Sequence, residues 1–242
     1  MKKTAFAIFM ALVLLFGLAS CDRLKIEIKD PKEESIAYGI LYYPENVYEM
    51  DIEHFVNREN DVYISYLFRL VSSTGIQSVS NVPWHEYKGF SSGKELSSKQ
   101  LLNFFFLADD YSDYYLDEEN KDYLIPVSDI HTVLSKYFSE YDLDIHDHSY
   151  NFEYLEDDTV IRSLGFVGID FIYHAGYSID SVVDNGDGTV KITVFINGTE
   201  MTENDEIIPT GEISEVHTMV IEPDKKSCKI CSYEVEYSEE KR

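Results

Sequence analysis

The chain has 242 residues, of which 45 are acidic and 20 are basic, and its formal net charge is −25. So acidic a surface repels nucleic acid and anionic lipid head groups, which leaves neutral molecules, cations and other proteins as the expected partners. Hydrophobic residues make up 44% of the chain and include 19 Tyr and 14 Phe. This composition excludes a disordered polypeptide and predicts a folded core.

The amino terminus has the layout of a secretory signal peptide. Lys2 and Lys3 precede an apolar run over residues 5–18. The run is shorter than the roughly 18 to 20 apolar residues that span a bilayer. It therefore predicts an export signal and not a transmembrane anchor.

The junction Leu18-Ala19-Ser20-Cys21 resembles the lipobox of bacterial lipoproteins, in which an apolar residue and two small residues precede an obligatory cysteine. The resemblance covers residues 1–21. It implies cleavage before Cys21, a diacylglyceryl group on the thiol of Cys21 and, often, acylation of the new amino terminus with a fatty acid such as palmitate. Two or three acyl chains anchor a protein lastingly, whereas one holds it only marginally. The alternative is a secreted protein with a chance cysteine at this position.

This cleavage divides the chain into a signal peptide at 1–20, a charged tether at 21–35 and a single folded domain at 36–242, with a subdivision near residue 125 left open. Loss of Lys2 and Lys3 takes the formal charge from −25 to −27. Because the mature chain is so acidic, the lipid on Cys21 is the expected membrane attachment. The implied location is the extracytoplasmic face of a cell membrane or envelope.

In the first half of the folded part, residues 36–43 predict a strand. Residues 62–71 fit a helix and a strand equally well, because five apolar residues lie on one helical face and five alternate. The helical set is Tyr63, Tyr66, Leu67, Leu70 and Val71, and the alternating set is Val62, Ile64, Tyr66, Phe68 and Leu70. Periodicity does not decide between a helix and a strand for residues 62–71.

Two later segments predict helices more clearly. Ser97 and Gln100 have the spacing of a capping box ahead of an apolar run. Ser128 is expected to cap a second helix, with Pro126 just ahead of it, where proline is tolerated. The apolar residues of this second helix recur at spacings of three and four: Ile130, Val133, Leu134, Tyr137 and Phe138.

From Phe166 onward the sequence predicts an antiparallel sheet, with hairpin turns at 185–188 and 223–226. The strand pairs are 176–184 with 189–197 and 213–222 with 228–237. Helices followed by a meander of long strands predict an α+β domain with its helices packed on the sheet. The order is similar to that of cystatin-like and NTF2-like folds, in which a curved sheet wraps a helix.

Cys228 and Cys231 form a C-x-x-C pair, but the residues around them alternate as in a strand, whereas a thioredoxin-like redox motif begins a helix. The Cα atoms of strand residues three apart are about 10 Å apart, beyond disulfide reach. We therefore expect free structural thiols unless a bulge bends the strand. Redox and zinc sites are the alternatives, and zinc would need further ligands.

Two serine motifs share one polar stretch. Residues 89–93 match the G-x-S-x-G nucleophile elbow, but a Gly/Ser-rich stretch replaces the strand-turn-helix context that this motif needs. Ser91 and Lys94 fit S-x-x-K, in which the lysine would activate the serine, yet the S-D-N and K-T-G partners are missing. A flexible loop is the favoured interpretation, and Ser91 with Lys94 remains the alternative for an envelope serine hydrolase.

Three segments could attract cations. Residues 184–188 resemble part of a calcium loop, but the ligand register is wrong and a hairpin turn is favoured. His146 and His148 would share one face of a strand and could reach one metal ion, yet no third ligand can be named and a solvated loop is favoured. The acidic run at 109–122 is also interpreted as solvated surface.

Trp84 and Tyr87 stand in an aromatic segment ahead of the first clear helix. Such side chains can stack on sugar rings or on a partner, but large aromatic side chains are more often buried, which is the favoured interpretation. No catalytic set is complete, and no motif implies a cofactor. The sequence therefore predicts a surface-tethered α+β lipoprotein that binds a ligand or partner, with a hydrolase and a cation-binding protein as alternatives.

Overall fold

The computed structural model describes residues 44, 47–75, 80–108, 115–117, 122–145, 152–155, 159–163, 176–201, 207–224 and 227–238. All of them belong to one compact unit, residues 37–242. The signal peptide, Cys21, the tether and the strand expected at 36–43 lie outside the described residues. No helix within these ranges is long and apolar enough to cross a membrane.

The helices come first along the chain and the long strands follow, so the fold class is α+β as the sequence predicts. The helices of the described ranges are α3 (Ile52–Val56), α4 (Asp61–Ser72), α6 (Ser98–Ala108) and α7 (Val127–Tyr137), with 3-10 turns η2 (Ser73–Gly75), η3 (Trp84–Glu86) and η4 (Gly93–Glu95). The strands are β1 (Gly89–Phe90), β2 (Tyr115–Asp117), β3 (Asp122–Pro126), β4 (Phe152–Leu155), β5 (Thr159–Ser163), β6 (Tyr177–Asp184), β7 (Val190–Met201), β8 (Ile207–Asp224) and β9 (Ser227–Tyr237).

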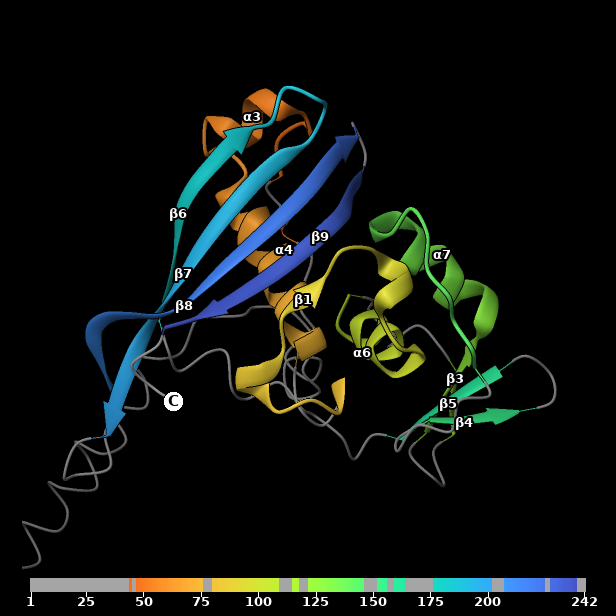
Figure 1. Cartoon of the computed structure of the whole chain (residues 1–242). Coiled ribbons are helices and arrows are strands. Elements are labelled where there is room, and N and C mark those ends of the chain that lie inside the picture. The colour runs from red at the N-terminus through yellow and green to blue at the C-terminus, as the bar shows by residue number, and fades with distance from the viewer. Residues whose placement is uncertain are drawn as a thin grey trace, which may run out of the picture. The chain divides into compact units, whose positions relative to one another are not determined.

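The main sheet has five antiparallel strands in the order β1-β9-β8-β7-β6. Alternate residues of its three central strands are buried in the core, which gives the sheet one inner face. Those residues include Val190, Ile192, Val194, Ile196, Met219, Ile221, Tyr233 and Val235. Helix α4 lies across this face (Figure 1), where the ring of Phe68 meets that of His217 on β8 with 5.2 Å between centroids.

The segment that periodicity leaves open is helix α4. All five residues of the helical set are buried, and so are Ile64 and Phe68 from the alternating set. Val62, the first residue of that alternating set, is 65% exposed. A helix that packs on several sides carries apolar residues in both patterns, which is why counting them could not distinguish helix from strand.

The two predicted helices begin in different ways. At α6 the capping box is formed, because Gln100 N donates to Ser97 Oγ at 3.3 Å and Ser97 N donates to Gln100 Oε1 at 2.9 Å. At α7 the N-cap is Pro126 and no side chain caps the helix. The prediction that Ser128 caps it is wrong, because β3 runs directly into α7 and Ser128 lies inside the first turn.

Both predicted hairpins are confirmed. In the turn between β6 and β7, Gly186 N donates to the Asp184 carboxylate at 2.7 Å, and Thr189 N donates to the Asp187 carboxylate at 3.0 Å. These carboxylates therefore stabilise the turn, in keeping with the hairpin interpretation of this segment. Strands β8 and β9 pair as predicted, but the pairing includes Pro223 and Asp224, which the sequence assigned to the turn.

The sequence did not predict a second sheet, which contains four antiparallel strands in the order β2-β3-β5-β4. Two of its strands fall at the end of the acidic run at 109–122, where Asp117 pairs with Asp122 across β2 and β3. These strands are only three to five residues long, so each is too short to show a clear apolar alternation. The interpretation of this run as solvated surface thus missed strand β2.

Candidate functional site

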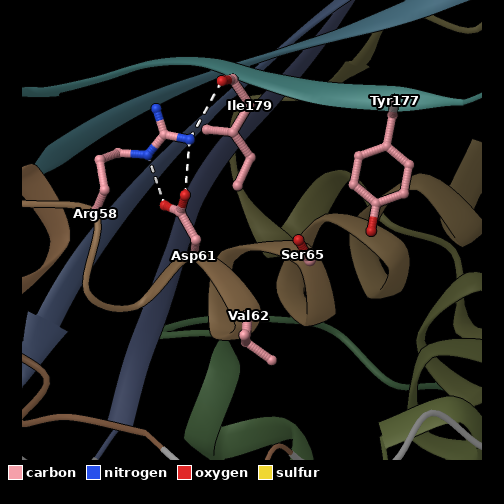
Figure 2. Close-up of a pocket in the computed structure, with 6 residues that line it drawn as sticks. All are labelled: Arg58, Asp61, Val62, Ser65, Tyr177 and Ile179. Atoms are coloured by element: carbon pink, nitrogen blue, oxygen red, sulfur yellow. Dashed lines mark hydrogen bonds and ion pairs between the residues drawn. The ribbon is translucent and has the colours of Figure 1, made fainter.

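A pocket of about 300 Å³ lies between the start of α4 and strand β6. Its lining residues are Arg58, Asp61, Val62, Ser65, Tyr177 and Ile179 (Figure 2). The two sides of the pocket meet where Arg58 Nη2 donates to the backbone oxygen of Ile179 at 3.3 Å, although these residues are 121 positions apart. The tertiary fold assembles this site, and no local motif encodes it.

Arg58 and Asp61 form a planar, two-bonded ion pair in the pocket. Arg58 Nε lies 2.6 Å from Asp61 Oδ1, and Arg58 Nη2 lies 2.8 Å from Asp61 Oδ2. Arg58 follows the C-cap of α3 in the left-handed region, with a φ of 66°. Asp61 lies in the first turn of α4, where the helix dipole favours a carboxylate. The hydrogen bond to Asp61 is the main reason why the pKa of Arg58 is raised above its usual value.

The remaining lining of the pocket is mixed in polarity. Ser65 and Tyr177 bring hydroxyl groups, while Val62 and Ile179 bring apolar surface. The Tyr177 ring packs against Phe68, with 5.1 Å between centroids. A few polar groups on an apolar background are typical of small-molecule sites, and this one is shallow and open to solvent.

A polar network lies within the core, around His217, whose ring contacts the same Phe68 that packs against Tyr177. His217 Nε2 lies 2.8 Å from Glu215 Oε2, and His217 Nδ1 lies 2.6 Å from Tyr233 Oη. An ionised Glu215 can only accept, so Nε2 carries a proton, and in the neutral imidazole Nδ1 then accepts from Tyr233. Burial raises the pKa of Tyr233 well above its usual value, which keeps this donor protonated.

This network resembles a proton relay, but its burial favours a structural role. His217 is 5% exposed and Tyr233 is 1% exposed. Both ring nitrogens of His217 have partners, so the imidazole is a satisfied core group that joins β8 to β9.

The candidates for an envelope hydrolase, Ser91 and Lys94, are held by different carboxylates. Ser91 Oγ donates to Glu95 Oε1 at 2.7 Å, whereas Lys94 Nζ lies 2.7 Å from Glu140 Oε2. The hydrogen bond to Glu140 raises the pKa of Lys94. Because a lysine that activates a serine must be neutral, this arrangement works against catalysis.

The structure describes only some of the aromatic and histidine candidates. Tyr87 is 8% exposed, its hydroxyl lies 2.8 Å from Thr74 Oγ1, and burial raises its pKa to about 12. It is therefore a core residue and not part of an exposed platform. The side chain of Trp84, and both His146 and His148, lie outside what the structure describes. Within the described residues, no three His, Cys, Asp or Glu side chains gather as metal ligands.

Cys228 and Cys231 are both free thiols. The pairing of β8 with β9 shifts at Cys231, so a bulge does occur there, yet no disulfide forms. Burial raises the pKa of both thiols. Since the thiolate is the reactive form, neither residue has the environment of a redox cysteine.

The pocket residues Arg58, Asp61 and Tyr177 were missed by sequence reasoning. Arg58 and Asp61 do have the spacing of an ion pair on one helical turn, but that spacing is common on protein surfaces and indicates no site. Comparison with known proteins adds no family, because no family model, curated protein or solved structure matches the chain.

Proposed function

We propose that this chain is a lipid-anchored extracytoplasmic lipoprotein whose α+β domain binds a ligand in the pocket between α4 and β6. The pocket is the observation that carries the binding role, because charged, hydroxyl and apolar side chains from the α3–α4 turn, α4 and β6 line it (Figure 2). The lipobox at residues 18–21 supports the anchor. The domain is proposed to belong to the cystatin-like or NTF2-like group of folds, which the helix across the inner face of the sheet supports.

Metabolic labelling with a fatty-acid analogue tests the anchor. The wild-type chain should be labelled and Cys21→Ser should not, because the thioether needs the thiol. Cys231→Ser is the matched control, since it removes another free thiol but should keep the label. Equal labelling of Cys21→Ser and the wild-type chain would rule out the lipid anchor.

A fragment screen by amide NMR tests the pocket in the detergent-purified full-length protein. Fragments that bind there should shift the resonances of Arg58, Ser65 and Ile179, which come from both sides of the pocket. The outward residue Glu236 on β9, which is exposed, reports non-specific effects. If no fragment shifts the three pocket residues selectively, the pocket is not a binding site.

A further inference from the structure

The charged side chains in and near the pocket favour a ligand without net charge. The Arg58 and Asp61 charges cancel within a pair in which both carboxylate oxygens are already bonded. A cation that approaches Asp61 would be repelled by the Arg58 guanidinium, which bonds both carboxylate oxygens. Asp180 lies close enough to act on Arg58, so an anion would meet repulsion as well as a competing carboxylate. A neutral ligand avoids both costs.

The polar groups of the pocket match a ligand that donates and accepts at neighbouring positions. The guanidinium of Arg58 has five N–H groups, and its Nη1 has no hydrogen-bond partner among the residues that the structure describes. Each Asp61 oxygen can accept a further bond. The hydroxyls of Ser65 and Tyr177 likewise make no hydrogen bond within the described ranges. Paired hydroxyl groups on a ring suit such a mixture, because each can both donate and accept.

The apolar part of the pocket fits the carbon face of the same ligand. Val62 is 65% exposed, and Ile179 and the half-buried Tyr177 ring complete an apolar surface. Phe68 fixes the Tyr177 ring in place. The volume of about 300 Å³ is at the lower end of the range for small-molecule sites, which is enough for about one or two rings.

We infer that the pocket binds a neutral sugar, with the carbon face of the ring on Tyr177 and Val62 and its hydroxyls on the Arg58–Asp61 pair, Ser65 and the Tyr177 hydroxyl. The inference rests on the proposed binding role of this pocket and gives it a ligand class. It is a recognition site, with no chemical step on the sugar.

Isothermal titration calorimetry of the detergent-purified full-length protein tests the ligand class. The probes are glucose, N-acetylglucosamine and cellobiose, compared with the anion glucose 6-phosphate and the cation glucosamine. At least one neutral sugar should bind with a dissociation constant on the order of 1 mM, and each charged analogue should bind at least about fivefold more weakly than glucose. A charged analogue that binds more tightly than every neutral sugar would overturn the inference.

Three variants locate the binding. Tyr177→Phe keeps the ring and should weaken sugar binding about fivefold through loss of one hydroxyl. Asp61→Asn should weaken it about tenfold and, because Arg58 loses its counter-charge, should strengthen binding of glucose 6-phosphate. Tyr48→Phe, on an exposed ring outside the pocket, should change neither. Circular dichroism confirms that each variant is folded.

These experiments distinguish failure of the sugar inference from failure of the proposed binding role of the pocket. If fragments shift the pocket resonances but no neutral sugar binds, the sugar inference fails and the proposed binding role stands. If neither fragments nor sugars act on the pocket, both fail. Sugar binding that is unchanged in Tyr177→Phe and Asp61→Asn would place the sugar elsewhere and would also overturn the inference.

Discussion

The buried hydroxyl of Tyr233 provides a strict test of the polar network in the core. Tyr233→Phe removes an oxygen from a ring that is 1% exposed, and His217 Nδ1, 2.6 Å away, loses its partner. A buried polar atom without a partner costs about 1–3 kcal/mol, because water cannot replace the lost bond. The ring itself stays, so only a very small cavity adds to this cost. We expect the free energy of unfolding to fall by about 2 kcal/mol.

Urea unfolding of the detergent-purified protein, followed by far-ultraviolet circular dichroism at neutral pH, measures this loss. Tyr48→Phe is the matched control, because its ring is 57% exposed and the change should stay within about 0.5 kcal/mol. Tyr233→Phe combined with His217→Leu should recover part of the loss, since the unpartnered nitrogen is gone. If Tyr233→Phe costs no more than the control, the hydrogen bond does not stabilise the core and the reasoning is refuted.

Two further variants test backbone geometry and pH dependence in the same assay. Gly89→Ala should lower the free energy of unfolding by more than about 3 kcal/mol, because φ is +91° and the new Cβ would lie 1.8 Å from Tyr233 O. Gly186→Ala, at φ +77° in open space, should lower it by only about 1 kcal/mol. Equal losses in the two variants would contradict this reasoning. The hydrogen bond to Asp51 raises the pKa of His54 above 6.5, so this stabilisation is complete below pH 6.5 and is lost as the pH rises through the raised value. His54→Gln should therefore destabilise more at about pH 5 than at about pH 9, and equal effects would exclude the charged pair.

The parts of the fold that sequence reasoning predicted are those with local signals. The β6–β7 turn has glycines at the two positions of positive φ, and the side chains of Asp184 and Asp187 bond the turn backbone. The capping box at Ser97 is likewise a bond between neighbours in the chain. Such contacts follow from sequence spacing alone, so they can be predicted without knowledge of the rest of the fold.

The errors arise where tertiary context outweighs local preference. Ser128 is a good N-cap residue, but the chain enters α7 directly from β3 and Pro126 takes the cap position instead. Helix α4 was ambiguous because it packs on several sides. Its apolar residues also fit the strand pattern because eight of its twelve residues are buried, on more than one side of the helix. In both cases the missing information is what the element packs against.

The pocket depends entirely on such non-local information. Arg58 stands in a polar stretch that looks like ordinary surface, and Tyr177 looks like an ordinary strand residue. Their meeting requires that α4 cross the inner face of the sheet and that β6 be its outermost strand beside the start of α4. The left-handed backbone at Arg58 is the one local irregularity in this segment, since a non-glycine residue rarely adopts positive φ unless its surroundings hold it there. The backbone turn that ends α3 supplies that hold, because Arg58 N donates to Phe55 O at 3.0 Å and Glu59 N donates to His54 O at 3.0 Å. From this turn the Arg58 side chain bonds Asp61 in α4 and Ile179 in β6.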